Sequence, residues 1–104
     1  MNFKTHNDYA LTALGTSLQG HINCSYKRLV EVFGEPYKGS YKTDAEWIIH
    51  FENDFIATIY NYKDGKNYCG KDGLEKSQIT DWHIGGDSTE SFDLIESILF
   101  HEED

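Results

Sequence analysis

Long apolar runs are missing from the sequence, and this shortage excludes two classes of protein. No run approaches the ~20 residues needed to cross a bilayer. The first ten residues, MNFKTHNDYA, have neither the basic start nor the apolar stretch of a signal peptide. We therefore expect a soluble protein that is not exported.

Cysteine is also scarce. Cys24 and Cys69 are the only two in the 104 residues, they lie far apart, and neither a CxxC spacing nor paired histidines accompany them. This pattern predicts free thiols in a reducing compartment rather than a disulfide framework or a zinc site. Because no catalytic motif is present either, we expect no enzyme activity, no metal ion and no cofactor.

Basic residues are outnumbered two to one. Nine lysines and arginines face 18 aspartates and glutamates, for a net charge of -9. This balance repels phosphate groups, so it argues against direct binding to nucleic acid or to an anionic membrane surface. The excess is local, because residues 81–104 hold eight acids and no lysine or arginine. A charge concentrated in this way favours a basic protein partner.

What is present fits a single folded domain over residues 1–104. Apolar residues make up 38% of the chain and aromatic residues 14%, enough for one core. Residues 1–14 are weakly patterned and predict a weakly structured start, and residues 101–104 read as an acidic tail.

The first clear elements are a strand and a helix. Residues 16–24 alternate loosely and predict a strand with Gly20 as a bulge. Ser25 is a suitable N-cap for a helix over residues 26–33. Gly34 supplies a left-handed end to this helix, and Pro36 prevents its continuation.

A hairpin is expected next, because two β-rich runs, 45–52 and 55–62, flank Asn53 and Asp54. We expect the Trp47 side of this hairpin to lie under a helix. The opposite side is a candidate surface for a homodimer. The two-residue turn predicts the facing pairs Phe51 with Ile56, Ile49 with Thr58 and Trp47 with Tyr60 on one side, and His50 with Ala57 and Ile48 with Ile59 on the other.

The remaining chain predicts a connection, a strand and a helix. Residues 63–78 are polar and glycine-rich, typical of a long connection. Residues 79–84 predict a strand that Gly85 and Gly86 break, and a helix capped by Asp87 or Ser88 runs to about Phe100. The whole pattern predicts an α+β fold, an antiparallel meander of about four strands with two helices packed on one face.

Acidic residues recur every third position along the last helix. The spacing places them in a slanting stripe that the tail extends, and its members are Asp87, Glu90, Asp93, Glu96, Glu102, Glu103 and Asp104. Such a row can imitate a nucleic-acid backbone toward a protein with a basic groove. The other interpretation is that the acids only keep the solvent face of the helix wet.

Candidate catalytic groups are few. Asp81 and His83 share one face of the last predicted strand, and His21, Cys24 and His50 could join them. The pairs Asp64–Gly65 and Asp72–Gly73 fit turns better than calcium loops. An alternative ligand pocket would combine His21, Trp82 and His83 with the Gly85–Gly86 turn, and would take a nucleotide by stacking and by backbone amides.

Two resemblances add to these inferences. The segments LGTSLQGHINCSYKRLVEVFGEP, KTDAEWIIHF, ATIYNYKDGKNY and ITDWHIGG, which span residues 14–86, resemble a group of small accessory proteins of tailed bacteriophages. The helix ending in LVEVFGEP, with its following tryptophan-bearing strand, is similar to the repeat of β-lactamase inhibitor proteins and of a lipoprotein of outer-membrane assembly. The first resemblance implies a phage gene product in the host bacterial cytoplasm, where small acidic proteins inhibit host defence as anti-CRISPR proteins and DNA mimics.

We therefore expect a phage counter-defence protein that occludes the basic groove of a bacterial nucleic-acid-binding effector such as a CRISPR nuclease. The alternative is a small protein that sequesters or degrades a nucleotide messenger of host immunity.

Overall fold

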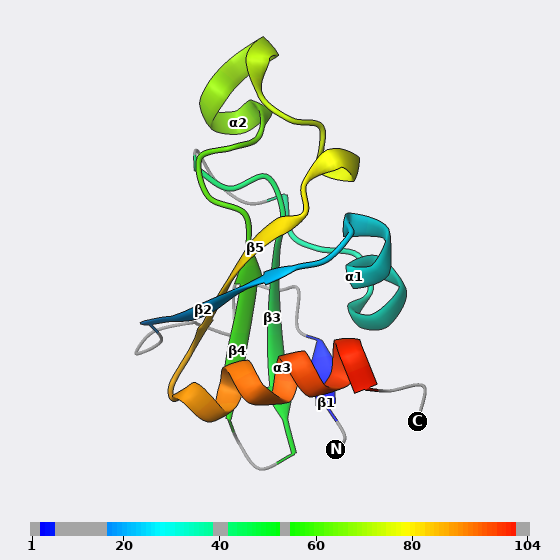
Figure 1. Ribbon diagram of the computed structural model, residues 1–104, viewed down its shortest axis with the longest axis vertical. Coiled ribbons are helices and arrows are strands. Elements are labelled where there is room, and N and C mark those ends of the chain that lie inside the picture. The colour runs from blue at the N-terminus through cyan, green and yellow to red at the C-terminus, as the bar shows by residue number, and fades with distance from the viewer. Residues whose placement is uncertain (1–2, 6–16, 39–41, 53–54, 102–104) are drawn as a thin grey trace.

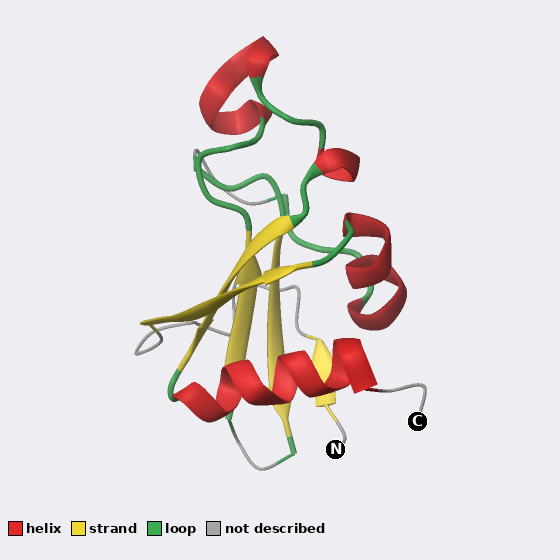
Figure 2. Cartoon of the chain, in the orientation of Figure 1, coloured by secondary structure: helices red, strands yellow, loops and turns green. Residues whose placement is uncertain are grey.

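The sheet has five antiparallel strands, one more than the sequence predicts (Figures 1 and 2). A computed structural model describes residues 3–5, 17–38, 42–52 and 55–101 of the chain. The strands are β1 (Phe3–Thr5), β2 (Ser17–Asn23), β3 (Glu46–Phe51), β4 (Ile56–Tyr60) and β5 (Asp81–Gly86). They lie in the order β1-β3-β4-β5-β2, so β3, β4 and β5 form a meander of three strands rather than of about four. The strand predicted at residues 16–24 is β2, which pairs with β5 at one side of the meander, and β1 pairs with β3 at the other. The α+β prediction is confirmed.

The additional strand is β1, which lies within the segment expected to be weakly structured. It pairs with β3 and brings Phe3 opposite Phe51. The Phe3 ring also lies 5.3 Å from the ring of Phe33, centroid to centroid. A strand of three residues has too little periodicity to be recognised in a sequence, and aromatic packing holds it in place.

Two helices pack on one face of the sheet and form a single core with it, as predicted. They are α1 (Tyr26–Phe33) and α3 (Thr89–His101), and α3 lies across the sheet in Figure 1. A third, α2 (Lys66–Cys69), belongs to the β4–β5 connection, which also holds the short turns η1 (Gly70–Asp72) and η2 (Lys76–Gln78) beyond the end of the sheet. The central buried residues are Leu29, Phe33, Trp47, Ile49, Phe51, Ile59, Trp82, Ile84, Ile95 and Leu99.

The boundaries of α1 follow from local chemistry and match the prediction. The Ser25 hydroxyl accepts a hydrogen bond from the Arg28 amide at 3.0 Å, which satisfies one free amide of the first turn. Gly34 ends the helix with φ of 88° and donates its amide to the Val30 carbonyl. The predicted bulge is also present, because the β2–β5 register shifts between Leu18 and Gly20.

The predicted hairpin register is wrong by one residue. Trp47 faces Ile59 and Ile48 faces Thr58, because residues 52–54 lie between Phe51 and Phe55 and the Phe51 amide donates to the Phe55 carbonyl. A shift of one residue exchanges the faces of one strand relative to the other. It places Ile59 in the core with Trp47, so Ile48 and Ile59 do not form one surface. The turn residues Asn53 and Asp54 lie outside the described residues.

Gly85 and Gly86 do not break the last strand but complete it. Gly85 pairs with Leu18 and Thr58, and Gly86 pairs with Ser17 and Ala57. A Cβ atom on Gly86 would lie 2.4 Å from the Cβ of Ser91. Glycine here lets the first turn of α3 approach the sheet.

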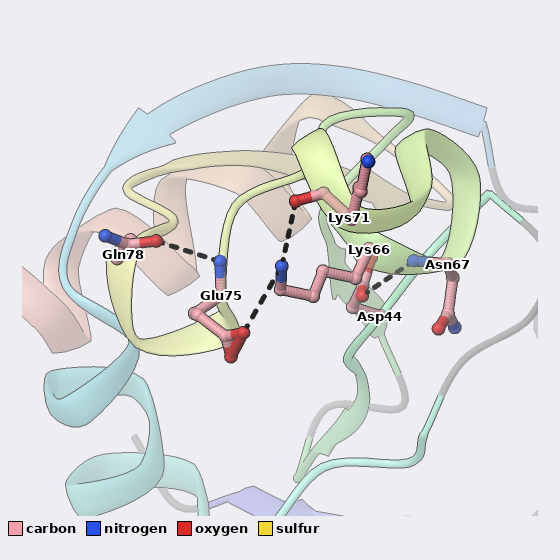
Figure 3. A network of polar contacts seen from close by, with 6 residues as sticks. All are labelled: Asp44, Lys66, Asn67, Lys71, Glu75 and Gln78. Carbon is pink, nitrogen blue, oxygen red and sulfur yellow. Dashed lines mark hydrogen bonds and ion pairs between the residues drawn. The ribbon is translucent and has the colours of Figure 1, made fainter.

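A polar network joins the β4–β5 connection to the start of β3 (Figure 3). The buried Asp44 carboxylate accepts from the side chain of Asn61 at 3.0 Å and from the amide of Asn67 at 3.1 Å. Within the connection, Lys66 Nζ contacts the Glu75 carboxylate at 3.5 Å and donates to the Lys71 carbonyl. These contacts give the segment a defined shape that its composition does not predict.

Candidate functional site

The acidic residues of the predicted stripe do not all have the same role. The Asp87 carboxylate accepts from the Ile56 amide at 3.0 Å and from the Ser91 hydroxyl at 3.3 Å, so it ties β4 to the start of α3. Glu90, Asp93 and Glu96 are exposed, whereas Ser91, Ile95 and Leu99 on the opposite side of the helix are buried. Glu102, Glu103 and Asp104 lie outside the described residues.

The alternative pocket does not form as predicted, because Trp82 lies on the wrong face of the sheet. Its side chain has no exposed surface and its Nε1 donates to the Cys24 carbonyl at 2.9 Å. The Trp82 and Trp47 rings meet at 5.4 Å in the core. Gly85 and Gly86 are buried as well. His21 and His83 therefore lack the tryptophan that was expected to stack on a ligand.

The two histidines and Asp81 do come together, on the face of the sheet opposite Trp82. His21 on β2 is the direct cross-strand partner of His83 on β5, and their ring centroids are 4.3 Å apart. His21 Nδ1 lies 3.6 Å from an Asp81 carboxylate oxygen. We call His21, Asp81 and His83 the histidine cluster. Of the other expected members, Cys24 is buried, and His50 lies on β3 opposite Ile56 and Lys4.

Two tyrosines and two lysines adjoin the histidine cluster. The sequence analysis did not identify them as site residues. Tyr60 and Tyr62 place their ring centroids 5.4 and 5.6 Å from that of His83. Lys63 Nζ lies 5.2 Å from the Tyr62 centroid, and Lys42 Nζ lies 6.0 Å from it. We call Tyr60, Tyr62, Lys42 and Lys63 the tyrosine–lysine group. Tyr60 is the last residue of β4 and Tyr62 lies two positions beyond it, but only the strand order brings Tyr60 beside His83.

The protonation of this region follows from burial and from neighbouring charges. Partial burial lowers the pKa of His83, and the nearby His21 lowers it further, whereas Asp81 and Asp64 act in the opposite direction. Burial also raises the pKa of Tyr60, with additional contributions from Glu46 and Tyr62. The imidazole of His83 is therefore biased toward its neutral form, and the phenol of Tyr60 stays protonated.

The cysteines offer no activated nucleophile in the described structure. Burial raises the pKa of the Cys24 thiol, although the nearby Arg28 opposes this effect. Cys69 is exposed, and its thiol donates to the Lys63 carbonyl at 3.3 Å. Both thiols are free, as predicted.

Comparison of the chain with protein-family models and with curated proteins gives no match. In the described part of the chain, no helix has both the length and the apolar character needed to span a membrane. The two candidate functional surfaces are the exposed acids of α3 and the histidine cluster with its tyrosine–lysine group.

Proposed function

We propose that this protein is a phage counter-defence factor that inhibits a bacterial nucleic-acid-binding effector, such as a CRISPR nuclease, in the host cytoplasm. In this proposal the exposed side of α3 occupies the basic groove of the effector in place of nucleic acid. The observation that supports it best is the row of Glu90, Asp93 and Glu96, three exposed carboxylates on one helix.

The spacing and the surrounding charge also favour this role. Successive members of the row rise about 4.5 Å along the helix axis, on the scale of the ~3.4 Å rise per phosphate of a DNA strand. Residues 81–104 contain no lysine or arginine that would neutralise the row from within the segment. Exposed charges of one sign steer association with a groove of the opposite sign.

The test removes the charge of the row without touching Asp87, since Asp87 holds β4 to α3. The parent chain is first used as bait to capture bacterial nucleic-acid-binding proteins. The variant E90Q/D93N/E96Q is then used as bait for the same proteins. We expect the variant to lose capture and to lose the ability to displace duplex DNA from the captured effector. Equal capture and displacement by the variant at low salt would contradict the proposal.

A matched control separates the position of the charges from their number. The variant E31Q/E52Q/D72N changes the net charge by the same amount through exposed acids on other elements. It is expected to retain the partner. If both variants weaken binding equally, overall charge rather than the α3 row would be responsible.

A second candidate function is the binding of a nucleotide messenger, and the tyrosine–lysine group favours it. Two lysines lie over the Tyr62 ring, next to two histidines, in a chain of net charge -9. Base stacking on Tyr62 with lysine contacts to phosphate is a common way to bind nucleotides. This arrangement replaces the predicted pocket that depended on Trp82.

Calorimetric titration with mononucleotides and cyclic dinucleotides tests this candidate. Tyr62→Ala should weaken binding by at least ~5-fold, since stacking contributes ~1–3 kcal/mol per base, and Lys63→Ala should also weaken it because a phosphate contact is lost. Lys38→Ala, at another exposed lysine, should leave the affinity unchanged. Binding that survives both Tyr62→Ala and Lys63→Ala would exclude this surface as the site.

A further inference from the structure

The histidine cluster joins three metal-ligating side chains from two neighbouring strands. His21 and His83 face each other directly in the β2–β5 register, and Asp81 precedes His83 by two positions on the same face. One ligand atom from each residue lies within 4.8 Å of the other two. Within this set, His21 Nδ1 lies 3.6 Å from Asp81 Oδ1.

We propose that His21, Asp81 and His83 bind one divalent transition-metal ion, with zinc as the best-fitting ion. Two imidazoles and one carboxylate form a ligand set suited to Zn²⁺ and to its neighbours Co²⁺ and Ni²⁺. Mg²⁺ and Ca²⁺ prefer all-oxygen sites, so they fit this set poorly. The site goes beyond the proposed function and does not depend on it.

The distances require only small side-chain rotations to close around an ion. Two ligand atoms that share a tetrahedral zinc at ~2.0–2.1 Å lie about 3.3 Å apart. The side chains of His21 and Asp81 are 51% and 65% exposed, so core packing does not fix their torsions. The strands themselves are held by regular pairing, which keeps the three backbone positions in place.

The ligand set carries negative charge and leaves an open coordination position. The Asp81 carboxylate lies 3.6 Å from His21 Nδ1, so it offers a charged oxygen ligand next to an imidazole nitrogen. Three protein ligands leave a fourth position on a tetrahedral ion for water or for an anionic ligand. Cysteine spacing alone gave no reason to expect such a site, because its ligands meet only through the pairing of β2 with β5.

The experiment titrates tag-free protein with ZnCl₂ by calorimetry and with CoCl₂ by visible absorption. We expect one ion per chain, and intense absorption bands that mark a four- or five-coordinate Co²⁺ with nitrogen ligands. His21→Ala should weaken Zn²⁺ binding by at least ~10-fold, and Asp81→Asn should weaken it by a smaller factor. His21 is exposed, so its replacement tests the site without disturbing the core.

The chain contains matched controls, since three of its five histidines lie elsewhere in the sequence. The variant H6N/H50N/H101N should keep the parent affinity and the Co²⁺ spectrum. His83→Gln, which keeps a polar side chain beside Tyr60, serves as a second test of the cluster and is checked for folding by circular dichroism. Absence of binding in the parent chain, or an unchanged affinity in both His21→Ala and His83→Gln, would overturn the proposal.

Discussion

At the scale of single residues, Glu46 is a carboxylate in an unfavourable place. It is half-buried on β3 opposite Tyr60, and burial raises its pKa. A raised pKa means that the folded state binds this proton more tightly than the unfolded state. The ionised carboxylate therefore lowers stability, and this loss grows as the pH rises from the ordinary carboxyl pKa through the raised one.

Glu46→Gln should accordingly raise the urea midpoint at pH 7, and the gain should shrink to little near pH 4, where the parent carboxyl is mostly protonated in both states. Urea unfolding at the two pH values measures it. The exposed Glu52→Gln is the control and should show no such difference. A gain of equal size at both pH values would mean that charge is not its cause.

A second residue-scale prediction concerns Gly86. An added Cβ would lie 2.4 Å from Ser91 Cβ and 3.1 Å from the Ile56 carbonyl oxygen, so α3 or the sheet must shift. We expect Gly86→Ala to destabilise the fold by ~1–3 kcal/mol, as overpacking does. Thermal unfolding measures the change.

The comparison is Gly34→Ala, where an added Cβ meets nothing within 4 Å but the backbone has φ of 88°. It should cost ~1–3 kcal/mol of backbone strain, because a φ of 88° with a ψ of -170° is a conformation almost confined to glycine. A Gly86→Ala variant as stable as the parent would show that α3 does not need this close approach.

At the scale of elements, Asn61 is the joint between β4, the β4–β5 connection and the start of β3. Its side chain is fully buried and makes four hydrogen bonds. The carbonyl oxygen accepts from the amides of Asp44 and Ala45, and the NH₂ group donates to the carboxylates of Asp44 and Asp64. No other amino acid of this size can do both.

Asn61→Ala should therefore destabilise the protein by about 3 kcal/mol or more, because it leaves two buried amides without an acceptor. Asn61→Asp should be worse at neutral pH, since it adds a carboxylate beside two others. Urea unfolding of both variants at pH 7 checks the order. An Asn61→Asp variant as stable as the parent would contradict this account of the joint.

Elements with local signals were predictable from the sequence, and those set by distant contacts were not. Ser25 and Gly34 mark α1 within a few residues, and the apolar spacing of residues 92–99 marks α3. The hairpin register depended on whether its turn has two or three residues, which composition does not decide. Likewise, Asp81 and His83 were expected on one face, but the neighbouring Tyr60 depends on the strand order.

At the scale of the whole molecule, the charge is unevenly distributed between its parts. Residues 81–104 contain eight acidic residues and no lysine or arginine. All nine basic residues lie in residues 1–80. Self-repulsion of this kind destabilises a compact state, and salt screens it over ~8 Å at physiological ionic strength.

Raising the KCl concentration from low to about half molar should therefore raise the melting temperature by a few degrees, as expected for a gain of ~0.5 kcal/mol. Differential scanning calorimetry measures it. The variant E90Q/D93N/E96Q should melt at a higher temperature in low salt and respond less to KCl. An equal response in both chains would show that the α3 row contributes nothing to the repulsion.

The order of the strands also governs how the chain assembles during synthesis. β1 and β2 leave the ribosome first, yet β1 needs residues 49–51 and β2 needs residues 81–86 as partners. The β1 side of the sheet therefore stays incomplete until the middle of the chain has been translated. The β2 side stays incomplete until the last third has been translated. At 5–20 residues per second, the segment that becomes β2 waits about 3–12 s with Ile22 and Cys24 unburied. The β3–β4 hairpin is thus the template on which β1 closes, whereas β2 must wait for β5.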